Sequence, residues 1–175
     1  MKKRSMSASR LAEAAVLAAM YAALTVLQQL ILPGSASLTV QLRLSEAMTL
    51  LSVFMPSAVP GLTVGCLIAN ALGCAAMPVD ILFGTLGTLL SCLAVRLTGG
   101  IRFKGLPVVS AAMPALFNGL IIGAELELFY IEGSFEFIGF LWQFLCVAAG
   151  ELIVCAAVGL PLFGTVEGLY KRSRK

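Results

Sequence analysis

Histidine is absent from this 175-residue chain, and charged residues make up only 12% of it. Without histidine, the chain lacks the commonest side chain for metal ligation and for general acid–base catalysis. It also lacks a G-x-x-x-x-G-K-[ST] phosphate-binding loop, because the glycines of Gly84–Thr88 are not followed by lysine. We therefore expect no histidine-dependent catalytic triad, no metal, no cofactor and no ATP hydrolysis by the chain itself.

The cysteines and the basic residues do not indicate a disulfide framework, a metal cluster or nucleic-acid binding. None of the five cysteines forms a CxxC pair, and all lie in apolar segments, so we interpret them as small core residues. The net charge of +3 gives no argument for nucleic acid, because the basic residues fall in three short clusters. These clusters are Lys2 to Arg10, Arg96 to Lys104 and Lys171 to Lys175.

Long apolar runs are what the chain does contain, with 59% hydrophobic residues. A membrane-spanning helix needs about 20 apolar residues, and runs of that order cover 11–32, 80–97, 106–130 and 137–162. The first run is longer than the apolar core of a signal peptide, so we expect a retained first span. We predict one integral membrane domain over residues 1–175.

The stretch between the first and second of these runs is interrupted by Pro56, Pro60 and Gly61. We predict two helices there, near 45–55 and 61–77. The basic loop Arg96–Lys104 lies on the same side as a cytoplasmic N-terminus only after an even number of crossings. Two spans or one re-entrant hairpin both satisfy this condition. We predict an all-α protein with six transmembrane helices and both termini in the cytoplasm.

Three acidic residues, Glu125, Glu127 and Glu151, lie inside the apolar runs. An ionisable group at bilayer depth costs about 2.5–3.5 kcal/mol and usually marks a functional site. Asn118 and Glu125 are seven residues apart and share a helix face, since seven residues turn about 700°; Glu127 faces elsewhere. A polar clamp between helices is the alternative, but at about 0.6 kcal/mol it does not offset a buried carboxylate.

The last predicted span places Phe140, Phe144 and Glu151 on one face and Trp142 on the opposite face. Glu151 suits either the floor of a ligand pocket or a protonated structural acid. Trp142 suits either a ligand contact or an aromatic belt at the membrane interface.

Polar and apolar residues alternate over Ser37–Glu46, which predicts a partly extended segment. We expect Gln41, Arg43 and Glu46 to cap a site from outside; an ion pair between Arg43 and Glu46 at a helix start is the alternative. Two further polar residues near the outer helix ends are Asn70 and Asp80. Asp80 also suits a helix N-terminus.

The first span carries Ala14, Ala18 and Ala22 at four-residue spacing, with Ala15, Ala19 and Ala23 in the adjacent row. Small residues at this spacing let another helix approach closely. The partner helix belongs either to another protein or to this chain.

Five segments resemble the QueT-type substrate-binding subunits of energy-coupling factor (ECF) transporters, and they extend over almost the whole chain. They are Val40–Leu51, Pro60–Gly73, Val79–Ser91, Pro114–Leu128 and Ala149–Leu162. The resemblance implies a six-helix subunit in the bacterial plasma membrane that docks on a coupling protein with two cytoplasmic ABC ATPases. In related subunits an alanine-rich first helix forms the docking surface, and Ala14, Ala18 and Ala22 match that pattern.

The implied substrates are queuosine precursors: 7-deazaguanines such as 7-aminomethyl-7-deazaguanine, or queuine. Their guanine-like edge offers two adjacent N–H donors, which a carboxylate accepts, and a carbonyl, which the amide of Asn118 or Gln41 serves. The aminomethyl cation requires a second carboxylate. Glu125 and Glu151 are the candidates for these two roles, in either order.

An aromatic side chain such as Tyr130, Trp142 or Phe144 can stack on the heterocycle. The complete set of candidate substrate-binding residues is Gln41, Arg43, Glu46, Asn70, Asp80, Asn118, Glu125, Tyr130, Trp142, Phe144 and Glu151. An autonomous transporter with Glu125 or Glu151 as a proton relay is one alternative function. An ECF subunit for another vitamin, such as riboflavin or thiamine, is a second.

Overall fold

The computed structural model describes residues 8–33, 40–73, 78–131 and 135–173. The predicted features at Lys2–Arg4, Ser37, Cys74 and the end of the 61–77 helix lie outside these residues. The described part of the chain is helical, apart from one isolated bridge between Phe103 and Leu106. Its elements are α1 (Ala8–Ile31), the 3-10 helix η1 (Leu44–Val53), α2 (Ala58–Leu72), α3 (Pro78–Thr98), α4 (Val108–Phe129), α5 (Phe137–Val154), the π-helical turn η2 (Cys155–Gly159) and α6 (Leu160–Ser173).

Within the described residues, four helices are long and apolar enough to cross a membrane: α1, α3, α4 and the continuous helix Phe137–Arg172 formed by α5, η2 and α6. These correspond to the four long apolar runs of the sequence. The last helix extends well beyond residue 162, where the prediction ended it. In a regular α-helix the ring of Pro161 would clash with the carbonyl of Ala157, and the wider π turn lies at this point.

The segment predicted as a span near 45–55 forms instead a ten-residue 3-10 helix. At about 2.0 Å per residue it is roughly 20 Å long, shorter than the 30 Å hydrocarbon core of a bilayer. Every residue from Ser45 to Ser52 is buried, so η1 lies inside the bundle. The fifteen-residue α2 is also short; Pro56 lies between it and η1, and Pro60 lies in its first turn, where proline is tolerated.

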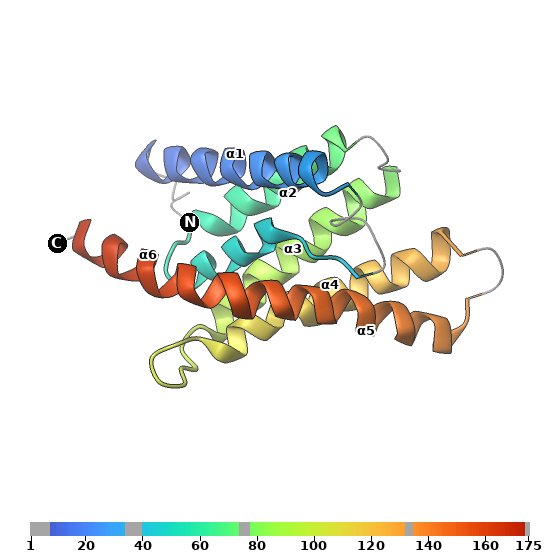
Figure 1. Ribbon diagram of the computed structural model, residues 1–175. Coiled ribbons are helices and arrows are strands. Elements are labelled where there is room, and N and C mark those ends of the chain that lie inside the picture. The colour runs from blue at the N-terminus through green and yellow to red at the C-terminus, as the bar shows by residue number, and fades with distance from the viewer. Residues whose placement is uncertain (1–7, 34–39, 74–77, 132–134, 174–175) are drawn as a thin grey trace, which may run out of the picture.

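Successive elements run back and forth between two ends of the molecule (Figure 1). The first turn of α1, the connection between α3 and α4 and the last turn of α6 lie at one end. The starts of α3 and α5 lie at the opposite end. Basic residues therefore gather at the first end, which carries Arg10, Arg96, Arg102, Lys104, Lys171 and Arg172.

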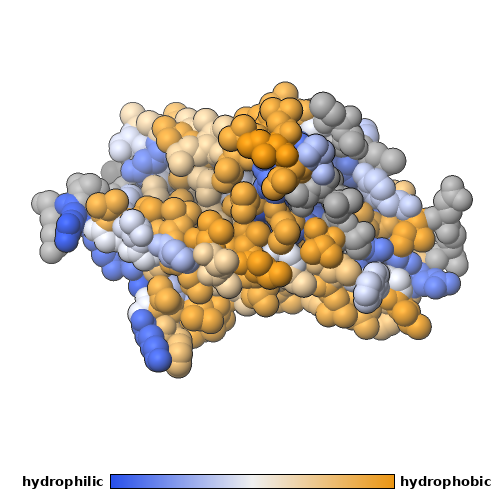
Figure 2. All heavy atoms as spheres, in the orientation of Figure 1, coloured by the Kyte–Doolittle hydropathy of each residue, from blue (hydrophilic) through white to orange (hydrophobic). Residues whose placement is uncertain are grey.

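The outer surface is apolar along the middle of the bundle. Hydrophobic spheres cover the centre of the face drawn in Figure 2, and hydrophilic ones gather toward its two ends. Large exposed side chains such as Leu30, Leu82, Ile138 and Ile153 contribute to this surface. Contiguous apolar surface of this extent is rare on soluble monomers and is expected of a protein surrounded by lipid.

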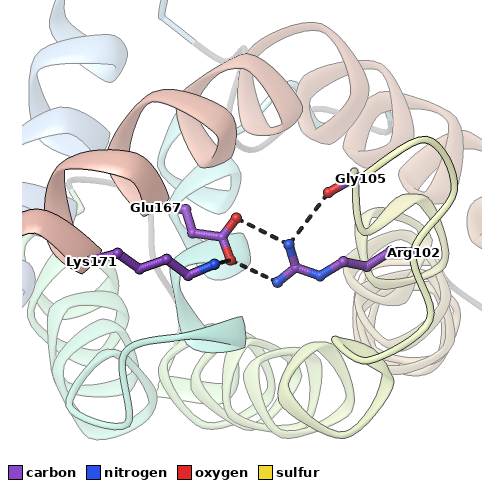
Figure 3. A network of polar contacts seen from close by, with 4 residues as sticks. All are labelled: Arg102, Gly105, Glu167 and Lys171. Carbon is purple, nitrogen blue, oxygen red and sulfur yellow. Dashed lines mark hydrogen bonds and ion pairs between the residues drawn. The ribbon is translucent and has the colours of Figure 1, made fainter.

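A charged clamp joins the α3–α4 connection to α6 at the basic end (Figure 3). Arg102 binds both carboxylate oxygens of Glu167, at 2.7 and 3.0 Å, and Lys171 lies 3.1 Å from the same carboxylate. The connection turns tightly at Lys104 and Gly105, both of which have positive φ, the pattern of a two-residue hairpin turn. The clamp thus fixes the end of α6 against this turn.

The first two α-helices touch through backbone. A Cβ added at Gly61 would lie 2.6 Å from the carbonyl oxygen of Ala14, and one added at Gly65 would lie 2.7 Å from that of Ala18. Ala14, Ala18 and Ala22 are all buried. The close approach that the alanine spacing predicts is therefore made within the chain. The adjacent row, Ala15, Ala19 and Ala23, is the exposed one.

Gly65→Ala is expected to lower the thermal stability of the purified protein in detergent by about 1–3 kcal/mol, the usual cost of overpacking. The matched control is Gly168→Ala on α6, where a Cβ meets nothing within 4 Å. Alanine favours a helix over glycine by up to about 1 kcal/mol, so the control is expected to be neutral or stabilising. Equal unfolding temperatures for the two variants would contradict the close α1–α2 contact.

Candidate functional site

One face of α3 carries two glycines, and polar residues from three other elements meet there. A Cβ added at Gly84 would lie 2.5 Å from Asn70 Nδ2, and one at Gly87 would lie 2.5 Å from Asn118 Oδ1. Thr88, one residue further on, donates a hydrogen bond to Glu46. Residues 84, 87 and 88 share a helix face, so the glycines make room for a buried polar cluster.

Glu46 is held in this cluster from two sides. The hydroxyl of Tyr21 on α1 and the hydroxyl of Thr88 on α3, at 2.8 Å, both donate to its Oε1. All three residues are fully buried. Charge-assisted hydrogen bonds of this kind are about twice as strong as neutral ones. A carboxylate at the start of η1 is thereby fixed in the middle of the bundle.

The segment that carries Gln41 and Arg43 turns these two side chains into the protein, and their capping of a site from outside stays a prediction. Gln41 and Arg43 are buried, whereas Val40, Leu42 and Leu44 are exposed. The side chain of Gln28 holds the segment by donating to the carbonyl of Leu42 and accepting the N–H of Leu44 at 2.9 Å. Polar residues point inward because the surroundings of the bundle are apolar.

Arg43 extends toward α2 rather than toward its neighbour Glu46. Its guanidinium donates to Asn70 Oδ1 at 3.4 Å and lies 3.7 Å from the Cys66 sulfur. Among the described residues its side chain forms no ion pair within 4.0 Å, so the predicted alternative of an Arg43–Glu46 pair is not seen. It still interacts electrostatically with Glu46 and Glu151. Arg43 is thus a buried cation shared by several acids.

Asn118 on α4 and Glu151 on α5 form the second half of the cluster. Asn118 Nδ2 donates to Glu151 Oε1 at 3.2 Å, and both side chains are buried. The inward faces predicted for these two residues therefore meet. Glu151 also interacts with Glu46 and Arg43, which places these charges in one electrostatic group.

Glu125 is buried on α4, two helical turns after Asn118. It interacts with the Asp80 carboxylate at the start of α3, and Asp80 Oδ1 accepts a hydrogen bond from the exposed Tyr130 hydroxyl at 2.6 Å. Glu127 turns instead to the start of α5, where it accepts the backbone N–H of Glu136 at 3.2 Å. The two glutamates face apart, as their spacing on the helix predicts.

The two aromatic residues proposed on α5, Trp142 and Phe144, do not belong to the buried polar cluster. Trp142 is 64% exposed on the outer surface and therefore lies outside the buried cluster. Phe144 is half-buried and packs on α4, where a Cβ added at Gly119 would lie 2.9 Å from its ring. Close helix packing accounts for Phe144 without a ligand.

Several buried oxygens of the cluster have no hydrogen-bond partner among the described residues. They are Gln41 Oε1, Glu46 Oε2, Asn118 Oδ1, Glu125 Oε1 and Glu151 Oε2. Arg43 Nε, a buried donor, also has no hydrogen-bond partner among these residues. Leaving a buried polar atom unsatisfied costs about 1–3 kcal/mol. The arrangement is therefore suited to a ligand with many N–H donors and few acceptors.

Two residues of the cluster, Tyr21 and Thr88, were not identified from the sequence. Tyr21 is the single aromatic residue among the alanines of the first span, and Thr88 lies in an apolar run. Either residue on its own is common in membrane helices. Their pairing with Glu46 depends on which helices are neighbours. Within the described ranges, no group of three or more His, Cys, Asp or Glu residues could hold a metal ion.

Trp142 offers a direct test of this geometry because it is the only tryptophan in the chain. In bilayers containing brominated lipid, most of its emission is expected to be quenched, since the exposed ring contacts acyl chains. Adding a ligand that occupies the buried cluster is expected to leave the emission spectrum unchanged. A tryptophan shielded from brominated lipid and shifted by ligand would return Trp142 to the site.

Comparison with known protein families adds an independent observation. The family model described as QueT transporter matches residues 11–168. No curated protein and no solved structure matches the chain. The matched range contains every side chain of the buried cluster, from Tyr21 to Glu151.

Proposed function

The chain belongs to the QueT transporter family and is therefore a multi-pass membrane transport protein rather than an enzyme; from this premise we propose that it captures 7-deazaguanine queuosine precursors for an ECF-type importer. The observation that carries the proposal is the set of buried acceptor oxygens that have no hydrogen-bond partner among the described residues, in the same cluster as the guanidinium of Arg43. Such a site favours a planar ligand rich in N–H groups.

The chemistry of 7-aminomethyl-7-deazaguanine matches this set. Its pyrimidine edge presents adjacent N–H donors for carboxylate and amide oxygens, and its carbonyl accepts from Arg43 or an amide. Its ammonium group can bind a carboxylate among Glu46, Glu125 and Glu151. Queuine, which keeps the same edge, is a second candidate. Riboflavin and thiamine present fewer donors on one edge.

In the proposed orientation the chain traverses the bundle six times, four times as a long helix and twice through the short η1 and α2, and both termini lie in the cytoplasm of a bacterial cell. The basic residues at one end of the bundle support it, because Lys and Arg are enriched on the cytoplasmic side. Asp80 at the start of α3 and Glu136 just before α5 lie at the opposite end, which is the outer side in this orientation. An acidic outer entrance attracts a cationic substrate by long-range steering.

The proposed partners are the membrane lipid, an ECF coupling protein and two cytoplasmic ABC ATPases. Docking through Ala14, Ala18 and Ala22 remains a prediction, although α2 covers these residues in the isolated chain. The exposed row formed by Ala15, Ala19 and Ala23 offers a partner helix the same small-residue surface without displacing α2. We include this row in the proposed docking surface.

Titration calorimetry in detergent is expected to show binding of 7-aminomethyl-7-deazaguanine at micromolar concentrations. Glu125→Gln and Glu151→Gln are each expected to weaken it by about 1.5–3 kcal/mol, the range for hydrogen bonds to charged groups. Glu127→Gln is the matched control. Glu127 is buried on α4 like Glu125, but its carboxylate binds the backbone at the start of α5 and not the buried cluster. Absence of binding would remove this substrate, and an equal loss in Glu127→Gln would refute the face assignment.

Uptake assays in proteoliposomes separate an ECF subunit from an autonomous transporter. The chain alone is expected to accumulate no substrate under a proton gradient, whereas addition of the coupling protein, the ATPases and ATP is expected to support uptake. Ala19→Trp should reduce that uptake without changing substrate affinity, since the bulky ring blocks helix approach. Leu152→Trp, at an exposed position on α5, is the control. Gradient-driven uptake by the chain alone would favour the secondary transporter.

A further inference from the structure

Glu46 differs from the other buried carboxylates in how it is held. Both of its strong donors, the hydroxyls of Tyr21 and Thr88, bind the same oxygen, Oε1. Its Oε2 has no hydrogen-bond partner among the described residues. Because the donors come from α1 and α3, the carboxylate is fixed from two sides while one oxygen remains available. This is the geometry of an anion positioned for a further donor.

Glu151 presents a different pattern. Its Oε1 accepts the Asn118 amide at 3.2 Å, and Glu151 Oε2 and Asn118 Oδ1 each lack a hydrogen-bond partner among the described residues. A guanine-like edge presents two adjacent N–H donors and requires two acceptors, which this hydrogen-bonded pair can supply. The base edge is therefore better served by Asn118 and Glu151 than by Glu46.

Charge separates the two carboxylates further. Arg43 interacts with both Glu46 and Glu151, but its hydrogen bonds go to Asn70 and Cys66. Glu46 receives two hydroxyl donors and Glu151 receives one amide donor, so Glu46 is the better-positioned partner for a cationic group of the ligand.

We propose that Glu46 binds the cationic aminomethyl group of the ligand and that Tyr21 and Thr88 are its positioning residues. The inference rests on the transport function proposed above and deepens it. It assigns the preference for a cationic ligand to Glu46 and recognition of the base edge to Asn118 and Glu151. Removing Glu46 should therefore change which ligand is preferred rather than abolish recognition of the base.

Titration calorimetry with two ligands that differ in the charge of one substituent tests this assignment. The first is 7-aminomethyl-7-deazaguanine, and the second carries a neutral nitrile in place of the aminomethyl group. Glu46→Gln is expected to weaken binding of the amine by about 10- to 150-fold, the equivalent of one charged hydrogen bond, and to leave the nitrile nearly unchanged. Glu151→Gln should weaken both ligands, and Glu127→Gln neither.

Tyr21→Phe tests the positioning role because it keeps the ring and removes only the hydroxyl donor. It is expected to lower the preference for the amine over the nitrile in the same direction as Glu46→Gln, by a smaller factor. Thr88→Val should act similarly. Tyr170→Phe, a tyrosine near the end of α6, is the control. If Glu46→Gln does not fold, the preference ratios of Tyr21→Phe and Thr88→Val decide the matter.

The outcomes separate this inference from the function on which it rests. Wild-type protein that binds neither ligand would overturn the proposed substrate and this inference together. Wild-type binding with an equal loss of both ligands in Glu46→Gln would overturn only the assignment of Glu46 to the cation. An unchanged preference in both Tyr21→Phe and Thr88→Val would overturn their positioning role.

Discussion

Polar groups inside a lipid-facing bundle must find partners within the protein, because the hydrocarbon around it offers none. Residues 40–44 show this constraint most clearly. In a water-soluble protein an alternating segment buries its apolar residues, but here Gln41 and Arg43 are buried while Val40 and Leu42 are exposed. The reversed pattern brings a guanidinium and an amide into the core. The rest of the buried cluster is arranged around them.

Glycines make this arrangement sterically possible. The polar side chains of Asn70 and Asn118 occupy the space that a Cβ would fill at Gly84 and Gly87 of α3. On the other side of the bundle, Gly150 of α5 admits the backbone of Gln41. Glycines on two helices thus allow an extended segment, two asparagine amides and two carboxylates to share one small region. Larger residues there would push the polar groups apart.

This construction links the fold to a transport role. A cluster of unpartnered acceptors is unfavourable without a ligand and becomes favourable when N–H donors arrive. The elements that carry it are also the irregular ones, since Glu46 lies on a 3-10 helix and Glu151 precedes the π turn at Cys155–Gly159. Departures from regular α-helix in membrane proteins are tolerated where they are buried in protein or line a cavity. Both occur here beside the proposed site.

The sequence by itself determined the all-helical membrane class, the four long spans, the family and the opposite directions of Glu125 and Glu127. These properties follow from hydropathy, length and helical periodicity, which are local. Only the tertiary structure decided that 45–55 is a buried 3-10 helix, that Arg43 reaches Asn70, that Ala14 packs on α2, and that Tyr21 and Thr88 bind Glu46. Periodicity gives the direction of a side chain from its own helix axis, but the identity of its neighbour depends on how distant segments pack.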